Sequence, residues 1–297
     1  MVRGGAIGRG DSAGLAKFRA VARLTPAIAN KELYDSGDAL SPRTVEVMDA
    51  PKETTMSTSP PTAEHRSATD PVDVSRLVVG VLGGTGPQGR GLAARLAAAG
   101  QRVLLGSRDA DKCASIAAEV AGRAGEASGR SDVSVTGGSN ADVAGAADVV
   151  IVAVPFAGHA ATLADLAAPL AGKVVVDCVV PMAFDEFGAY AVDVPEGSVT
   201  QQAATLLPDS SLVGAFHHLS AVLLENLSRE LEGDVLVVGD DRGATDTVQA
   251  LADRLSGLRG IYAGRLRNAR QVEALTVNLV SVNRRYKVHA GVRITDV

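Results

Sequence analysis

Three glycines in the first third of the chain, Gly84, Gly86 and Gly89, have the spacing of a turn that binds a dinucleotide. In such a turn the first glycine permits a tight bend, and the second lets the backbone approach a pyrophosphate. The third lets a helix pack closely on a strand. A flexible glycine-rich loop would show the same spacing, so the elements around it must decide. The residues that we expect to contact the nucleotide here are Gly84, Thr85, Gly86, Pro87, Gln88 and Gly89.

The elements on either side of the glycines fit a nucleotide site. A β-rich apolar run at 77–82 predicts a buried strand before the turn. Apolar and small residues at helical spacing over 92–99 predict a helix that ends at Gly100, and 102–105 predicts a second strand. The amino end of the helix would offer free N–H groups to phosphates. The order strand, glycines, helix, strand therefore favours a nucleotide site over a plain loop.

The end of the second strand indicates which nucleotide. An NAD site has an Asp or Glu there for the ribose 2′-hydroxyl, whereas this chain has Ser107 and Arg108, with Lys112 one helical turn on. A hydroxyl, a guanidinium and an ammonium would suit a 2′-phosphate, so the pattern favours NADP over NAD. The alternative is that both cations are solvated at a helix start. Asp109 and Asp111, which suit a helix N-terminus, keep that alternative open.

Strand and helix patterns alternate from residue 74 to the end, which predicts an α/β fold: a doubly wound parallel sheet with a smaller C-terminal β/α domain. We expect a disordered extension or linker at 1–73, an NADP-binding domain at 74–182, and a second domain at 183–297 that closes a cleft. Further strands are expected at 133–136, 148–154, 173–178, 211–216, 234–238 and 259–262. Further helices are expected at 109–124, 140–146, 159–170, 200–207, 219–227, 244–255 and 267–286, with a loop over the site at 184–199.

Composition argues against several other classes of protein. A net charge of -5, 3% aromatic residues and no Trp give no case for binding nucleic acid. No uninterrupted apolar run reaches membrane-spanning length, so we expect no membrane partner. Cys113 and Cys178 form no disulfide framework, which fits a reducing cytoplasm. No His, Cys or carboxylate cluster has metal spacing, so we expect no metal.

Over residues 76–297 the chain resembles the NADPH-dependent reductases of coenzyme F420. The resemblance is carried by collinear motifs: GGTGPQGRG at 83–91, GSRDADK at 106–112, VPFAGH at 154–159, VVPM at 179–182, GAFHHLSA at 214–221, VVGDD at 237–241 and AGRLRNARQVEALT at 263–276. One departure is Leu219-Ser220, where the family commonly has Ile-Pro, in the segment expected to contact the deazaflavin.

The resemblance implies hydride transfer between the nicotinamide C4 of NADP(H) and the C5 of coenzyme F420. We expect a cytoplasmic enzyme that forms a homodimer through its C-terminal helix. Such a reaction needs two flat rings stacked at reacting distance and shielded from water, and little acid–base help. The expected cofactor wall comprises Val154, Pro155, Phe156, His159, Val180 and Pro181. The expected substrate wall comprises Phe216, His217, Leu219 and Ser220.

Each of these wall residues has a structural alternative. Any one of them could serve ordinary packing at a strand end. His217 could hydrogen-bond the deazaflavin and is the candidate catalytic residue, but a satisfied structural histidine fits equally well. His159 begins an expected helix, so a capping or phosphate-side role competes with simple exposure.

Three other functions stay open at this point. An NADPH-dependent imine or keto-acid reductase would usually have a longer helical second domain and a catalytic Lys or Asp. A non-enzymatic NADP-sensing protein would lack a cleft for a second ring. A membrane-attached metalloreductase domain is weakened by the lack of a spanning segment.

Overall fold

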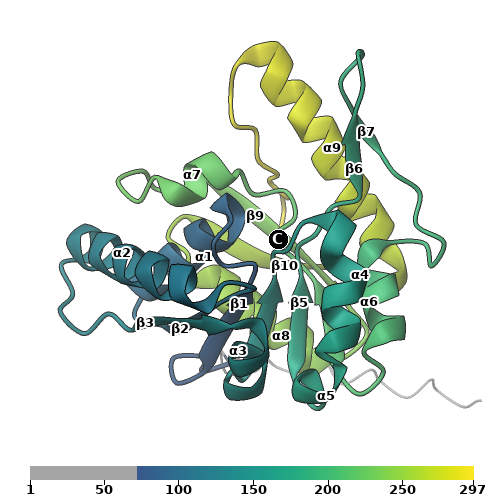
Figure 1. Cartoon of the computed structure of the whole chain (residues 1–297). Coiled ribbons are helices and arrows are strands. Elements are labelled where there is room, and N and C mark those ends of the chain that lie inside the picture. Colours follow the sequence, from purple (N-terminus) through teal and green to yellow (C-terminus); the bar gives the residue numbers. More distant parts are fainter. Residues whose placement is uncertain (1–71) are drawn as a thin grey trace, which may run out of the picture. The chain divides into compact units, whose positions relative to one another are not determined.

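The computed structural model describes residues 72–297, and in this part of the chain eight strands form one sheet. Their order across the sheet is β10-β9-β8-β5-β4-β1-β2-β3 (Figure 1). The strands are β1 (Val78–Leu82), β2 (Arg102–Ser107), β3 (Val135–Ser139), β4 (Val149–Val152), β5 (Val174–Asp177), β8 (Ser211–Gly214), β9 (Gly233–Gly239) and β10 (Leu258–Gly264). The predicted extension at 1–73 lies, except for its last two residues, outside the described residues.

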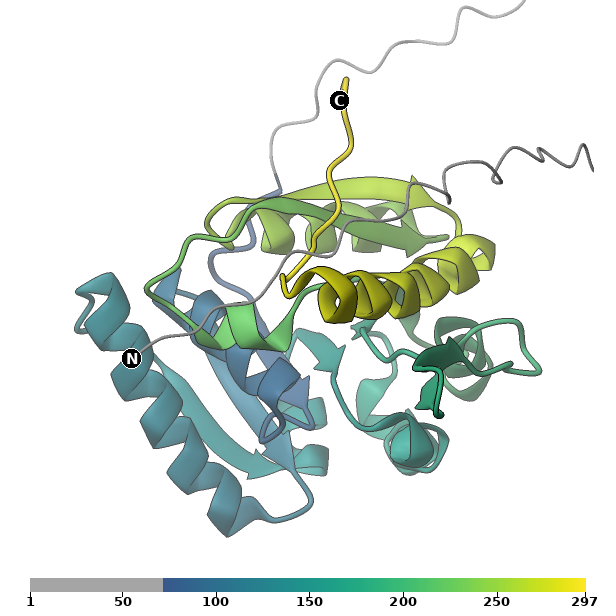
Figure 2. The ribbon, with the colours of Figure 1, turned by 90° about the horizontal axis from the view of Figure 1, so that it is seen from above.

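Helices cover both faces of the sheet, as the predicted doubly wound fold requires (Figure 2). They are α1 (Pro87–Ala98), α2 (Ala110–Ser128), α3 (Asn140–Ala146), α4 (Phe156–Asp165), α5 (Ala167–Leu170), α6 (Val199–Leu206), α7 (Ala221–Glu225), α8 (Arg242–Asp253), the 3-10 turn η1 (Leu266–Asn268) and α9 (Ala269–Tyr286). Alternate residues of β4 enter two separate cores: Ile151 packs with α1, α2 and α8, whereas Val150 packs with α3 to α6. The β-branched run of β4 is thus buried on both faces, as a parallel strand between helix layers must be.

One neighbouring pair departs from the predicted parallel sheet. β8 and β9 are antiparallel, with Val213 opposite Gly239, while the other strand pairs of the sheet are parallel. The reason lies in the connection, because α7 has five residues and does not carry the chain back across the sheet. β9 therefore starts at the edge where β8 ends, and β9 and β10 run opposite to the rest.

Residues beyond 183 add β8, β9 and β10 to the sheet begun by β1 to β5. The β/α succession predicted for 183–297 is present in them. The boundary predicted between residues 182 and 183 stays a prediction, since strands from both sides of it join this one sheet.

The expected loop at 184–199 begins instead as a small hairpin. β6 (Met182–Phe184) pairs antiparallel with β7 (Ala189–Ala191), and the hairpin lies beside α9 (Figure 1). The Asp185 carboxylate accepts hydrogen bonds from the backbone N–H of Phe187 at 2.8 Å and Gly188 at 3.0 Å. This side-chain turn, with strands of three residues, is too short to show a period-2 pattern in the sequence. Among the described helices, none combines the length and apolarity that crossing a bilayer needs.

Candidate functional site

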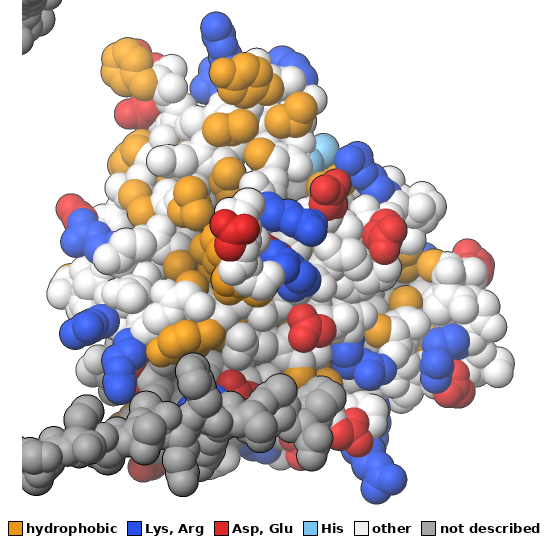
Figure 3. Space-filling model, turned by 180° about the vertical axis from the view of Figure 1, so that it is seen from behind, with side chains coloured by type: hydrophobic (Ala, Val, Ile, Leu, Met, Phe, Trp, Pro, Cys, Tyr) orange, Lys and Arg blue, Asp and Glu red, His pale blue; other side chains and the backbone are white. Residues whose placement is uncertain are grey.

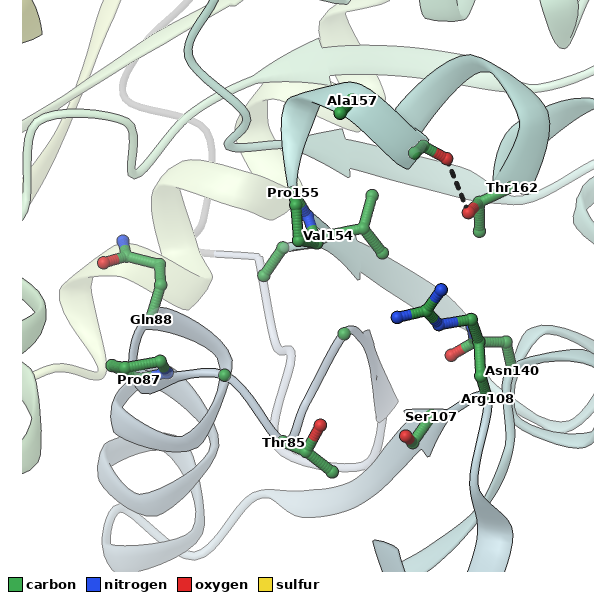
Figure 4. A pocket seen from close by; sticks show the side chains of 14 residues that line it. Thr85, Pro87, Gln88, Ser107, Arg108, Asn140, Val154, Pro155, Ala157 and Thr162 are labelled. Atoms are coloured by element: carbon green, nitrogen blue, oxygen red, sulfur yellow. Dashed lines mark hydrogen bonds between the residues drawn. The ribbon is translucent and has the colours of Figure 1, made fainter. Parts of the chain in front are cut away.

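A cavity of about 670 Å³ opens where β1, β2 and β4 end (Figure 4). This is the carboxyl edge of the parallel strands, the place where doubly wound sheets bind ligands. Its volume is within the range of small-molecule and cofactor sites. The residues predicted from the sequence that line it are Thr85, Gly86, Pro87, Gln88, Ser107, Arg108, Val154 and Pro155.

The three spaced glycines have different surroundings. A Cβ on Gly84 would lie 2.6 Å from the Leu105 side chain, and one on Gly89 would lie 2.8 Å from the Gly83 carbonyl oxygen. These two glycines therefore permit close packing inside the turn, and neither lines the cavity. A Cβ on Gly86 would meet nothing nearer than 3.4 Å. Gly86 faces the cavity, where a bare backbone lets a phosphate approach.

Two helices present open amino ends to this cavity. Gly86 is the N-cap of α1 and Pro155 is the N-cap of α4, and neither has a side-chain capping bond. The first N–H groups of a helix lack partners inside the helix, and the helix dipole adds partial positive charge there. By contrast α3 is capped by Ser139, whose hydroxyl accepts from the Asp142 N–H. The uncapped ends suit the anionic pyrophosphate of a dinucleotide, so the residues present fit this group.

The two predicted cations behave differently at the end of β2. Arg108 lines the cavity, and Figure 4 shows its guanidinium on the same side as Ser107. Lys112 is exposed and is not part of the lining, and its backbone N–H donates to Asp109 Oδ1 at 3.0 Å. Because Asp109 closes the amino end of α2, a phosphate at this corner would be read by side chains rather than by the helix terminus.

Asn140 lines the cavity but was not among the expected site residues. It follows β3 directly, at the same edge as Ser107, and its Oδ1 is buried with no hydrogen-bond partner among the described residues. A buried acceptor without a partner is unusual, and together with its place in the cavity lining it marks Asn140 as a candidate site residue. Its place after a strand was the available signal, but Asn140 was interpreted from the sequence only as a helix cap, and that is wrong because Ser139 is the N-cap of α3.

The expected cofactor wall is only partly at the cavity surface. Val154 and Pro155 line it, while Phe156 is half-buried and packs against the core below α4. Val180 is half-buried and Pro181 is buried, and neither lines the cavity.

His159 is a core residue below the wall. The expected capping role and the alternative of simple exposure are both wrong, because Pro155 is the N-cap of α4 and His159 is buried. It is fully buried, and its Nε2 lies 2.7 Å from the carboxylate of Asp177 at the end of β5. Burial lowers the pKa of His159, but Asp177, through its hydrogen bond and charge, and to a smaller extent Gln202 and Glu273 raise it, so the net pKa is raised. Asp177 also accepts from the Val179 N–H at 3.0 Å. The pair therefore fixes the backbone that leads from β5 into the wall.

The expected substrate wall follows β8, whose carboxyl end shares the edge of the cavity. Phe216 is fully buried in the core, so the structure favours packing for its side chain. His217 is 4% exposed, and neither ring nitrogen has a partner among the described residues. Burial lowers its pKa to about 4, which keeps the ring neutral near pH 7.

Leu219 and Ser220 are the half-buried members of this wall and have surface to offer a ligand. The Ser220 hydroxyl lies 3.1 Å from Nδ1 of His289. Both cysteines are buried; the Cys178 thiol donates to the Val152 carbonyl at 3.0 Å, and burial raises its pKa, so it is a packed side chain rather than a nucleophile. No group of three or more His, Cys, Asp or Glu in residues 72–297 could hold a metal ion.

Comparison with known proteins agrees with this geometry. The family model described as NADP oxidoreductase, coenzyme F420-dependent, matches residues 78–181. The F420-dependent NADP reductase of Methanothermobacter thermautotrophicus is 39% identical over 230 residues, which cover 76% of this chain and 97% of that protein. The enzyme of the same name from Methanocaldococcus jannaschii is 35% identical over 225 residues, covering 74% of this chain and 99% of that protein.

A solved structure also matches over this region. The crystal structure of a putative F420-dependent NADP reductase from Arthrobacter sp. FB24 is 27% identical, with a TM-score of 0.61. The match covers 74% of this chain and 99% of that one. With relatives above 30% identity aligned over nearly their whole length, this chain belongs to the family of F420-dependent NADP reductases.

Proposed function

We propose that the protein transfers a hydride between the nicotinamide C4 of NADPH and the deazaflavin C5 of coenzyme F420. The observation that carries the proposal is the cavity at the ends of β1, β2 and β4, which joins two uncapped helix termini to Arg108. This cavity occurs in a chain whose relatives are named F420-dependent NADP reductases along nearly their full length. NADPH supplies the hydride, and the protein's task is to hold and align the two rings.

The pyrophosphate of NADP is assigned to the turn from Gly84 to Gly89, with the open amino end of α1 facing it. The 2′-phosphate is assigned to Ser107 and Arg108, with Lys112 as an outer charge. The nicotinamide would lie against Val154 and Pro155. Phe156, Val180 and Pro181 support this wall, and His159 holds it from below through Asp177.

The deazaflavin is assigned to the space in front of the segment after β8. Leu219 and Ser220 would contact its rings. His217 is buried and neutral, and both of its ring nitrogens lack a partner among the described residues. It would hydrogen-bond the deazaflavin only after a small movement that exposes one of these nitrogens. A site with few charged groups would exclude water from the transferred hydride and leave proton transfer to solvent.

A homodimer is the second part of the proposal, and α9 with the β6–β7 hairpin is its surface. Large apolar side chains are exposed here: Phe184 at 66%, Phe187 at 87%, Tyr190 at 46% and Tyr286 at 70%. Figure 3 shows hydrophobic side chains along this end of the described residues. Apolar surface of this kind is typical of subunit contacts. A cytoplasmic location would suit the two free cysteines, Cys113 and Cys178.

The test mixes purified protein, NADPH and oxidised F420 and follows the loss of the deazaflavin absorbance. We expect loss that depends on both reactants and on the protein. Tight NADPH binding without any absorbance change, at every pH tried, would contradict the proposal and favour an NADP-sensing protein. Turnover of an imine or keto acid in place of F420 would favour the other reductase class. Light scattering of the full chain tests the dimer.

A further inference from the structure

One side chain connects the wall of the nucleotide cavity to the turn after β8. Gln88 lies in the first turn of α1 and lines the cavity (Figure 4). Its Nε2 donates a hydrogen bond of 3.1 Å to the backbone carbonyl oxygen of Phe216. The two residues are 128 positions apart in the sequence, so this is a contact between the two halves of the proposed site.

Phe216 is a strained point in the backbone. Its φ is +62°, a left-handed conformation that is unfavourable for a residue with a large side chain. Two features hold it there: the ring is fully buried in the core, and the carbonyl is bonded from outside. The other donor to this carbonyl, the Leu219 N–H, is 3.4 Å away and contributes less. The Gln88 amide is therefore the better bond that holds the turn leading to His217, Leu219 and Ser220.

The rest of α1 is fastened to the segment that follows this turn. A Cβ on Gly91 would lie 2.5 Å from Leu224 Cβ, so α1 and α7 are in close contact, side by side in Figure 2. The Arg95 guanidinium donates to the carbonyls of Leu223, Leu224, Asn226 and Arg229. Arg90 adds an ion pair of 2.7 Å with Glu225. Of these α1 side chains that contact the segment after β8, Gln88 is the one that also lines the nucleotide cavity.

We propose that Gln88 is a positioning residue that couples the two binding sites. Its amide holds the Phe216 turn at a fixed distance from the amino end of α1, where the NADP pyrophosphate is assigned. NADP bound against α1 therefore orders the 217–220 segment, so the residues that contact the deazaflavin are in position before it binds. This inference rests on the proposed function for the identity of the second ligand, but not for the coupling between the cavity and the turn.

The first test is Gln88→Met, which keeps the length of the side chain and its helix propensity but removes the donor. We expect the KM for F420 to rise about five- to tenfold, the loss of one hydrogen bond, and the Kd for NADPH to rise by a smaller factor. Gln88→Lys restores a donor and should return the KM for F420 toward that of the wild type. The matched control is Gln249→Met on α8, the same substitution at the opposite edge of the sheet, which should change neither constant.

The second test needs no F420. Hydrogen–deuterium exchange of the full-length protein is followed in the peptide covering 214–224, with and without NADP⁺. In the wild type NADP⁺ should slow exchange in this peptide; in Gln88→Met exchange should be faster, and the effect of NADP⁺ should be lost.

The two tests separate failure of the coupling from failure of the proposed function. Exchange in Gln88→Met identical to that of the wild type would overturn the inference, as would a loss confined to NADPH affinity. If the wild type reduces no F420 but the exchange differences appear, the coupling stands and the proposed function fails.

Discussion

Two strand–turn–helix units of this molecule look alike in sequence and differ in what they can bind. β1 leads through Gly86 into α1, and β9 leads through Gly239 into α8. The amino end of α1 is left without a side-chain cap. The amino end of α8 is closed by Asp241, whose carboxylate accepts from the Ala244 N–H at 2.7 Å. A carboxylate thus occupies the place on α8 that a phosphate would take on α1.

Both turns border a cavity, since one of about 550 Å³ lies beside Asp240 and Arg242. The presence of a cavity therefore does not distinguish the two turns. Position and capping do separate them. The antiparallel pairing of β8 with β9 puts the α8 turn at the edge of the sheet opposite the nucleotide cavity. From this comparison we expect a glycine turn between a strand and a helix to bind a nucleotide only when its N–H groups are free and face the edge where the parallel strands end.

The strongest way to break the comparison is to give α1 the cap of α8. Gly86→Asp has room, since a Cβ there meets nothing nearer than 3.4 Å, and its φ of -79° suits any residue. We expect the Kd for NADPH, measured by calorimetry, to rise about a thousandfold (about 4 kcal/mol), because the carboxylate takes the N–H groups and repels the pyrophosphate. The melting temperature should be unchanged or higher. Gly86→Asn, neutral and of the same size, should lose less; equal losses would mean that bulk rather than charge is responsible.

The junction between β8 and β9, which separates the two turns, contains two buried histidines that make the stability of the fold sensitive to acid. His218 Nε2 accepts from the Leu236 N–H of β9, and burial lowers the pKa of His217 and of His218 to about 4, from an ordinary 6.5. The unfolded chain therefore binds more protons between pH 6.5 and 4, and the free energy of unfolding should fall as the pH drops through this window. The raised pKa of His159 acts oppositely: its contribution is complete below its ordinary pKa and is lost as the pH rises through the raised value.

His218→Gln keeps an acceptor for Leu236 and removes one titrating group. It should restore on the order of 3 kcal/mol of the free energy of unfolding lost between neutral pH and pH 4. Urea titrations across the pH range measure this, with the exposed His289→Gln as the control. A slope unchanged by His218→Gln would mean that the pKa of His218 does not differ between the folded and the unfolded protein.

The third helix end, that of α2, sharpens the comparison because it is capped and yet borders the cavity. If side chains alone read the 2′-phosphate there, Arg108→Ala should weaken NADPH binding about thirty- to a hundredfold and NADH binding less than about threefold. Lys112→Ala should have a smaller effect, since Lys112 does not line the cavity, and the double variant should show the largest preference for NADH. Arg102→Ala, at the other end of β2, is the matched control. Equal weakening of both nucleotides would refute the assignment.

The smallest expected effect comes from opening α8. Asp241→Ala removes its cap and should lower the free energy of unfolding by about 1 kcal/mol, with NADPH affinity unchanged. Asp241→Asn keeps a capping oxygen and should retain most of the stability. Loss of NADPH binding in Asp241→Ala would show that the two turns are not independent.

Local signals were enough to predict the turn between β1 and α1. The residues from Gly84 to Gly89 carry their own geometry, and the helix expected at 140–146 has the observed bounds of α3. What the sequence could not show depends on distant partners. His159 is a core residue because Asp177 lies beside it, and the orientation of β9 depends on how far α7 carries the chain. Burial of Phe216 and the orphaned oxygen of Asn140 likewise follow from packing between elements, which no local pattern encodes.

The antiparallel pairing of β8 with β9 also determines where the protein should tolerate an added group. The 239–242 turn lies at the edge of the sheet opposite the cavity, so we expect a bulky label attached there to leave turnover unchanged. That turn is consequently a natural attachment point for a fluorophore, a tether to a solid support, or fusion to a second enzyme that consumes the reduced product.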